Sequence, residues 1–151
     1  MAQDLEAFRD LKLGEFSDDP TLNLSEARII LEKSLEARDK RAKELNPNHQ
    51  GQAYKESDIL IKTREYLQLF ASFKEMQSAE DAERTINELG AGMERFERSQ
   101  IGTLVPGSAD EAKALIPSLE KKCEENIVSE VSLEQLCREL ARLKQTNQIG
   151  M

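Results

Sequence analysis

The segment from Phe96 to Lys122 constrains the fold more than any other part of this chain, because it dictates two helices separated by a sharp break. Pro106 lacks a backbone donor and Gly107 tolerates positive φ angles, so the first helix must end there. Ser108 and Glu111 have the spacing of a capping box for the second helix. An apolar stripe continues across Pro117 and comprises Ala112, Leu115, Ile116 and Leu119. The chain must bend while burying this stripe, which predicts a compact helical corner.

The size and composition of the chain favour a small, mainly helical protein. Its 151 residues can bury one ordinary core together with an extended arm. Charged residues make up 33% of the chain and aromatic residues only 5%, which favours helices. The net charge of -8 argues against a general binder of duplex DNA, because such binders neutralise phosphates with basic side chains. Between Arg28 and Lys43 basic residues alternate with acidic ones, which indicates a solvated helix end.

No residue pattern indicates a catalytic centre, a metal site or a cofactor. Cys123 and Cys137 are far apart and form no CxxC or Cys/His ligand pattern, which suits a reducing compartment. Cys137 falls on an apolar helix stripe, so we interpret it as a small core residue. His49 lies in a polar loop without carboxylate or cysteine company, so we expect it to be solvated. The first residues lack the order of a signal peptide, and no apolar run reaches membrane-spanning length.

Residues 1–24 form an arm that cannot be stable alone. Leu11, Leu13 and Phe16, and later Leu22 and Leu24, alternate with polar residues, which predicts short extended pieces. Backbone donors and acceptors in such strands need a ladder partner. Either the strands pair with each other, or another chain supplies the sheet.

A long helix is predicted to follow the arm, with Ser25 as its cap. Its first half carries an apolar face, and its second half is almost entirely polar and should project into solvent. The polar stretch that contains His49 then predicts a flexible loop. The resulting organisation is a partner-binding arm with the first long helix over 1–45, a flexible polar loop over 46–56, and a helical bundle over 57–151.

Three helices are predicted within the bundle besides the two of the corner. A broad apolar arc from about Ser57 to Met76 indicates a helix buried against several neighbours, and core packing is favoured over stacking on bases. Ser78 should cap a short helix that ends at Gly90 and Gly92. Ser132 and Gln135 have capping-box spacing at the start of the last helix.

Two strings, FERSQIGTL at 96–104 and EAKALIPSLEKK at 111–122, resemble the C-terminal domain found in the family of the fourth subunit of RNA polymerase II, which includes its archaeal counterpart. The family pattern is Phe-Glu-x-Ala-Gln-Leu-Gly-x-Leu followed by Glu-Ala-x-x-Leu-Ile-Pro-Ser-Leu. The matching positions are Phe96, Glu97, Gln100, Gly102, Leu104, Glu111, Ala112, Leu115, Ile116, Pro117, Ser118 and Leu119. Ser99 and Ile101 replace the usual alanine and leucine without upsetting the apolar pattern. LKLG and LNLSEARIILE resemble, more loosely, the family's entry strand and first long helix.

This resemblance implies a non-catalytic subunit of DNA-directed RNA polymerase II, located in the nucleus. In the family, the fourth subunit pairs with the seventh to form a stalk near the RNA exit channel, which supports transcription initiation and the handling of nascent RNA. The implied fold is mainly α: a helical bundle similar to the helicase and RNase D C-terminal domain, preceded by an extended arm with short strands and a long helix. The implied partners are the seventh subunit and the polymerase core, with direct RNA contact only weak and local.

Two other interpretations stay open at this stage. One is the equivalent stalk subunit of RNA polymerase III or of an archaeal polymerase. The other, less favoured, is a small helical nucleic-acid-processing enzyme, which lacks support because no base is paired with a nucleophile.

Two sets of residues carry these expectations. We expect a partner to contact the arm and the start of the first helix through Leu11, Leu13, Leu22, Leu24, Ile29 and Ile30. We expect the core of the C-terminal domain to contain Phe96, Leu104, Leu115, Ile116, Leu119, Leu136 and Leu140.

Overall fold

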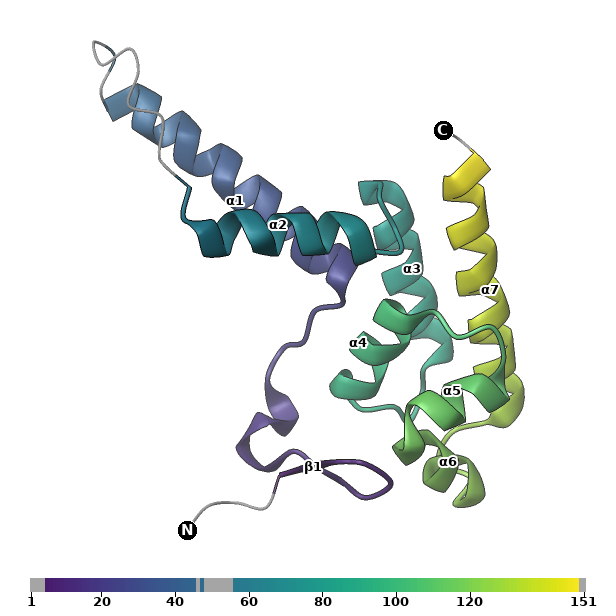
Figure 1. The fold of residues 1–151 in the computed structure, drawn as a ribbon. Helices are drawn as coiled ribbons and strands as arrows, with labels where there is room; N and C mark the ends of the chain where they lie inside the picture. Colours follow the sequence, from purple (N-terminus) through teal and green to yellow (C-terminus); the bar gives the residue numbers. More distant parts are fainter. Residues whose placement is uncertain (1–4, 46, 48–55, 150–151) are drawn as a thin grey trace.

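The computed structural model describes residues 5–45, 47 and 56–149, with side chains up to 146, and it is mainly helical (Figure 1). The elements in chain order are β1 (Glu6–Ala7), β2 (Leu11–Lys12), the 3-10 helix η1 (Gly14–Asp18), α1 (Leu24–Leu45), α2 (Asp58–Phe70), α3 (Met76–Leu89), α4 (Arg95–Leu104), α5 (Ala109–Leu115), α6 (Pro117–Glu124) and α7 (Glu130–Ile149). The predicted fold class is confirmed. The predicted flexible loop lies almost entirely outside the described residues, and His49 is among those left out.

The core of the molecule lies among α3 to α7, with α3 and α7 side by side along most of their length (Figure 1). On each of the two helices the buried residues are spaced three or four positions apart, as on the apolar face of an amphipathic helix. The largest fully buried side chains of this core are Phe73, Ile101, Leu119, Leu133, Leu136 and Leu140. Ile116 is also buried. Cys137 is fully buried among them, in agreement with its interpretation as a small core residue.

Two of the predicted core residues are in fact exposed. Leu104 is 42% exposed, because it is the last residue of α4 and the chain turns away at Val105, which adopts φ 47°. Leu115 is 48% exposed, because Ala109, Ala112 and Ile116 occupy the inward face at this end of the corner. Phe96 is only half-buried. The apolar pattern therefore located the corner correctly but assigned it too broad a buried face.

The helical corner has its predicted break and its Ser108 cap, but the return bond of the predicted capping box goes to the Gly107 amide in place of the Ser108 amide. The Ser108 hydroxyl accepts a hydrogen bond from the Glu111 amide at 3.2 Å, and the Glu111 carboxylate accepts one from the Gly107 amide at 2.7 Å. Pro117 stands at the first position of α6, where its missing donor costs nothing. Ile116 ends α5 and precedes α6 with φ −126° and ψ 83°, so the bend falls between the two helices.

The starts of α1 and α7 differ from the sequence prediction, because the capping residue stands two positions earlier at α1 and three positions earlier at α7. Asn23, not Ser25, caps α1: its side-chain oxygen accepts from the Glu26 amide at 2.9 Å, and the Glu26 carboxylate accepts from the Asn23 amide at 2.8 Å. At α7, the Ser129 hydroxyl accepts from the Ser132 amide at 3.4 Å, so the helix begins at Glu130.

The predicted helix from Ser57 to Met76 is interrupted at Ala71, whose ψ of 125° is extended. Phe73 lies fully buried in the interruption, and its amide donates to the Ser25 hydroxyl at 3.0 Å. α3 then begins at Met76, before Ser78, so Ser78 is not its cap. A tertiary contact to α1 fixes this break, and no proline or glycine marks it in the sequence.

Candidate partner interface

The arm begins as a small antiparallel hairpin that pairs with itself. Glu6 lies opposite Lys12 and Ala7 opposite Leu11, and the Lys12 ammonium lies 3.4 Å from the Glu6 carboxylate. The sequence left open whether the strands of the arm pair with each other or with the sheet of another chain. In the chain without a partner, β1 and β2 pair with each other. Phe8, in the turn of the hairpin, is 61% exposed, so the hairpin carries an apolar side chain that its own chain does not cover.

The rest of the arm rests on α4 through polar contacts. The Arg95 guanidinium donates to the carbonyl oxygen of Asp18 at 2.7 Å, and the Thr21 hydroxyl donates to the carbonyl oxygen of Arg95 at 2.9 Å. Phe16 in η1 and Leu22 before α1 remain exposed. Polar contacts therefore hold the arm on α4 while the side chains of Phe16 and Leu22 stay exposed to solvent.

The residues predicted to bind a partner separate into two groups. Leu11 and Leu13 line a hollow between the hairpin and α6. The other group surrounds the start of α1 and comprises Leu22, Leu24, Ile29 and Ile30. No strand forms at Leu22 and Leu24, which corrects the extended piece predicted there, because Asn23 caps the helix between them.

Within the second group, exposure differs from one residue to the next. Leu22 and Ile30 are about half exposed. Ile29 packs partly against the chain's own core, which leaves less of it for a partner. Whether the six residues bind a partner stays a prediction, and the exposed ones are the best placed to do so.

One apolar surface was missed because its stripe had been assigned to the core. α2 packs on α1 with Leu67, which is buried, while Ile59, Tyr66, Leu69 and Phe70 on its other side are exposed. Ile59 is 79% exposed, and the rings of Tyr66 and Phe70 contact each other with centroids 4.7 Å apart. The apolar arc of this helix was wider than a single buried face needs, and that width is the signal for a second contact surface.

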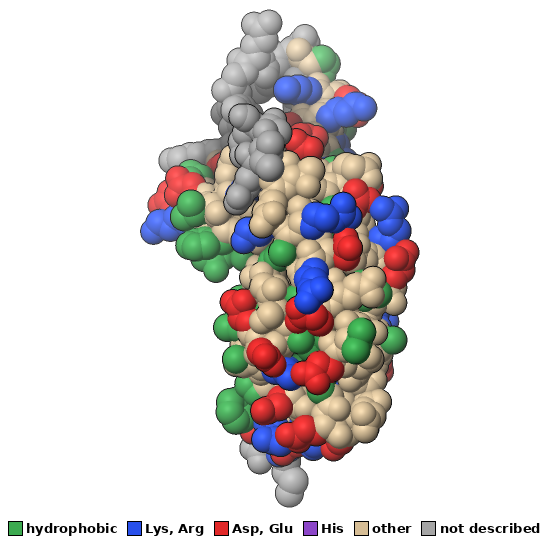
Figure 2. Space-filling model, turned by 90° about the vertical axis from the view of Figure 1, so that its right-hand side faces the viewer, with side chains coloured by type: hydrophobic (Ala, Val, Ile, Leu, Met, Phe, Trp, Pro, Cys, Tyr) green, Lys and Arg blue, Asp and Glu red, His purple; other side chains and the backbone are tan. Residues whose placement is uncertain are grey.

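The surface around these elements mixes charge and apolar character. Figure 2 shows hydrophobic side chains gathered along the left-hand edge of the view, with acidic and basic side chains interspersed elsewhere on that face.

Polar contacts surround the start of α1. The Arg28 guanidinium lies 2.9 Å from the Glu32 carboxylate and also donates to the carbonyl oxygen of Lys74. Burial raises the pKa of Glu26, although its hydrogen bond from Asn23 opposes the shift.

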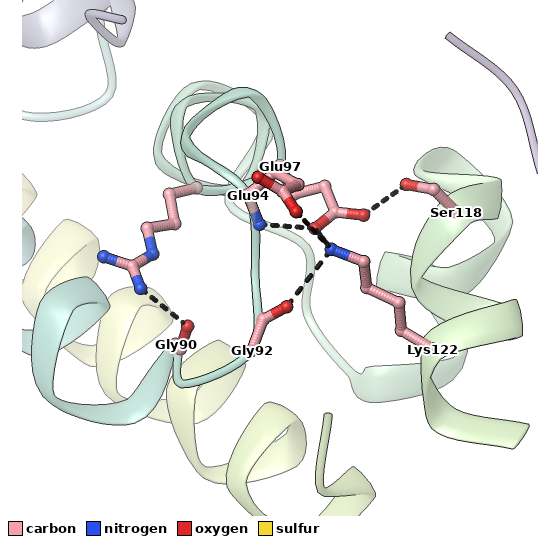
Figure 3. A network of polar contacts seen from close by, with 7 residues as sticks. Gly90, Gly92, Glu94, Glu97, Ser118 and Lys122 are labelled. Atoms are coloured by element: carbon pink, nitrogen blue, oxygen red, sulfur yellow. Dashed lines mark hydrogen bonds and ion pairs between the residues drawn. The ribbon is translucent and has the colours of Figure 1, made fainter. Parts of the chain in front are cut away.

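A buried charge network positions α6, on which the hairpin rests (Figure 3). Glu97 of α4 is fully buried and accepts hydrogen bonds from the Ser118 hydroxyl at 2.6 Å, the Lys122 ammonium at 2.8 Å and the Glu94 amide at 2.8 Å. Lys122 also donates to the carbonyl oxygen of Gly92 at 3.1 Å. α4 and α6 are thus joined by a satisfied ion pair rather than by apolar contact alone.

The thiols have no features of a nucleophile. Burial raises the pKa of Cys137 to about 11 and also raises the pKa of Cys123, which is the opposite of activation. Among residues 5–45, 47 and 56–149, no group of three or more metal-ligating side chains comes together. Over the same described residues, no helix has both the length and the apolar character needed to cross a membrane.

Two curated relatives share extended similarity with the chain. DNA-directed RNA polymerase II subunit rpb4 of Schizosaccharomyces pombe is 36% identical over 135 residues, which cover 89% of this chain and 88% of that protein. DNA-directed RNA polymerase II subunit RPB4 of Saccharomyces cerevisiae is 34% identical over 85 residues, which cover 56% of this chain and 35% of that protein.

Fold and surface together define a class of protein: a small helical bundle with an arm that polar contacts hold on α4 and with apolar side chains left uncovered on the arm, α1 and α2. The chain also matches the model of the RNA polymerase Rpb4 family over residues 21–144. It therefore belongs to the RNA polymerase Rpb4 family, as the strings around the helical corner indicated, and as a member of this family of polymerase subunits it is a non-catalytic protein. The match begins at residue 21, so β1, β2 and η1 precede it.

Proposed function

We propose that this chain is a non-catalytic subunit of RNA polymerase II that pairs with the seventh subunit, and that the pair forms the stalk near the RNA exit channel. The observation that carries the proposal is the division of the molecule: α3 to α7 enclose a complete core, whereas the arm, α1 and α2 leave apolar side chains uncovered. Family membership and the names of the relatives support the polymerase II assignment.

The uncovered side chains favour a protein partner over solvent. Phe8, Phe16 and Leu22 lie along the arm, and Ile30 continues the series onto α1. Exposed apolar side chains that follow one another along a segment are typical of protein contact surfaces. A two-stranded hairpin is marginal by itself, so its strands gain stability when a partner's sheet extends them.

The alternative assignments of the chain have weaker support than a subunit of RNA polymerase II. An equivalent subunit of RNA polymerase III or of an archaeal polymerase would share the fold, but both relatives above carry the name of RNA polymerase II. Direct contact with nascent RNA is at most local, because the chain is acidic overall and phosphate binding needs basic side chains. A polymerase II subunit acts in the nucleus, and that location forms part of the proposal.

Co-purification with the seventh subunit tests the proposal. The chain and the seventh subunit are expressed together, and the fraction that elutes as a heterodimer is compared for the wild type, Leu22→Asp and Ile30→Asp. Each variant places a charge in a contact that should be apolar, so we expect the Kd of the heterodimer to rise at least tenfold, or about 1.4 kcal/mol, and the heterodimer fraction to fall with it.

Val131→Asp is the matched control. Val131 is 78% exposed on α7, away from the arm, so the same change there should leave pairing intact. All three variants should unfold within a few degrees of the wild-type temperature, because the replaced side chains are about half exposed or more. Normal pairing of Leu22→Asp and Ile30→Asp would refute the proposed contact surface.

A further inference from the structure

Charged contacts join the turn of the hairpin to the helical bundle. The Arg9 guanidinium lies 2.7 Å from the Glu124 carboxylate and 3.6 Å from that of Glu120, and the Lys121 ammonium lies 2.5 Å from the Asp10 carboxylate. Hydrogen bonding between Asp10 and Lys121 lowers the pKa of the carboxyl and raises that of the ammonium. Arg9 and Asp10 belong to the turn between β1 and β2, so these contacts fix the turn on α6.

Behind these contacts the hairpin and α6 do not meet closely. A hollow of about 480 Å³ lies between them, lined by Leu11 and Leu13 on one side and by Ile127 on the other. A well-packed interface leaves few voids larger than a water molecule. Leu11 of β2 and Leu13 just after it are therefore only half-buried, and the ion pairs add to this incomplete apolar contact.

We propose that the ion pairs of Arg9 and Asp10 with α6 form a reversible latch, which stores the arm as a self-paired hairpin until the seventh subunit displaces it. The inference rests on the proposed pairing with that subunit. While the latch is closed, the turn between β1 and β2 cannot leave α6. Opening the latch releases the whole hairpin from α6, so that the edge of β2 that does not face β1 can extend the partner's sheet.

The ion pairs of the latch are weak enough for the hairpin to leave α6 reversibly. Exposed ion pairs of this kind shift an equilibrium by about 1.5-fold to fivefold each, and salt screens them. A partner that binds only the open arm has an apparent Kd equal to its intrinsic Kd divided by the fraction of chains that are open. Weakening the latch should therefore tighten pairing with the seventh subunit, although it removes contacts from the free chain.

Limited proteolysis of the free chain measures opening directly. Trypsin needs the chain around Lys12 to be extended and detached from α6, so the rate of cleavage after Lys12 follows the population in which the latch is open. Glu124→Arg places a cation opposite Arg9 and should speed cleavage after Lys12 about twofold to fivefold. Combining Arg9→Glu with Glu124→Arg restores opposite charges and should return the rate toward that of the wild type.

Glu130→Arg is the matched control, because it reverses the same charge in an ion pair of similar length, 2.6 Å to Lys113, that involves no residue of the arm. It should leave cleavage after Lys12 unchanged. If Glu124→Arg does not speed cleavage either, no latch exists.

Affinity for the seventh subunit then tests whether the latch gates pairing. Titration calorimetry should show Kd falling about twofold to fivefold for Glu124→Arg, and returning toward the wild-type value in the charge-swapped double variant. Faster cleavage with an unchanged or higher Kd would show that the latch does not gate pairing and would overturn the inference. A wild-type chain that fails to bind the seventh subunit would overturn the proposed function itself and the gating with it, whereas the proteolysis result depends on the ion pairs alone.

Discussion

The Lys122 ammonium nitrogen lies 2.8 Å from a carboxylate oxygen of Glu97, whose side chain is 0% exposed. This pair connects α4 with α6 and belongs to the same network that caps α4 through the Glu94 amide. A carboxylate so deeply buried needs its cation, because the interior cannot solvate an unpaired charge. The position of α6, and with it the support of the hairpin, depends on this contact.

Replacing Lys122 with methionine should therefore destabilise the protein strongly. The substitution keeps most of the apolar volume but leaves Glu97 without its cation, so we expect the free energy of unfolding to fall by about 3 kcal/mol. Urea denaturation followed by circular dichroism measures this change. Lys113→Met, which breaks only exposed ion pairs with Asp110 and Glu130, should cost less than about 1 kcal/mol. Equal losses in the two variants would contradict the role given to the buried pair.

Adjacent residues of the helical corner should respond very differently to a new charge. Ile116→Asp buries a carboxylate without a partner and should cost about 3 kcal/mol or more. Leu115→Asp places the same group at a position that is 48% exposed, so the cost should stay below about 1 kcal/mol. Thermal unfolding of both variants measures the difference. The assignment of the inward face fails if the two midpoints fall together.

The helical corner was predictable because all of its signals are local. Pro106, Gly107 and Pro117 restrict the backbone by themselves, and the Ser108 cap needs only the next three residues. The same holds for the apolar periodicity that located Leu119, Leu136 and Leu140 in the core. Periodicity does not say how much of an apolar arc is buried, which is why Leu104 and Leu115 were misplaced.

The remaining errors come from contacts between distant segments. The break between α2 and α3 depends on the Ser25 hydroxyl and on the buried ring of Phe73, and neither leaves a local signal at Ala71. The apolar stripe of α2 predicted core packing, although its side chains are exposed, because the same periodicity results whether the chain itself or a partner covers the stripe. For the arm, the alternation of apolar and polar residues predicted strands. It does not indicate whether these strands pair with each other or join the sheet of another chain.

Removing the arm should separate folding from pairing. Deleting residues 1–20 keeps the Asn23 cap of α1 and the whole core of α3 to α7, so the midpoint of thermal unfolding should shift by only a few degrees. Pairing with the seventh subunit should be sharply weakened, because the predicted contacts through Leu11 and Leu13 are gone. Size-exclusion chromatography of the mixture reports the pairing. Undiminished pairing of the shortened chain would mean that the arm is not part of the interface.

The buried thiol of Cys137 should make stability fall in alkaline solution. Burial raises its pKa in the folded protein from the ordinary value of 9.0 to about 11. Above pH 9 the unfolded chain therefore loses this proton before the folded one, and each pH unit up to about 11 removes up to about 1.4 kcal/mol from the free energy of unfolding. Below pH 9 the thiol contributes no pH dependence. Denaturation from pH 7 to pH 10.5 should show this decline in the wild type, and a slope that persists unchanged in Cys137→Ala would exclude the thiol as its source.

The close approach of α4 to the start of α1 gives the last prediction. A Cβ added at Gly102 would lie 2.8 Å from the side-chain nitrogen of Asn23 and 3.2 Å from the Cδ1 atom of Ile86. Asn23 is itself buried and caps α1, so it cannot move aside without loss of its hydrogen bond to the Glu26 amide. Gly102→Ala should therefore cost about 1–3 kcal/mol, even though alanine is the better helix former. Gly107→Ala is the control, because the nearest atom there, at 3.1 Å, belongs to the flexible Glu111 carboxylate, which can shift. Chemical denaturation should rank Gly102→Ala well below Gly107→Ala in stability, and the reverse order would show that α4 and α1 do not approach as closely as the structure has them.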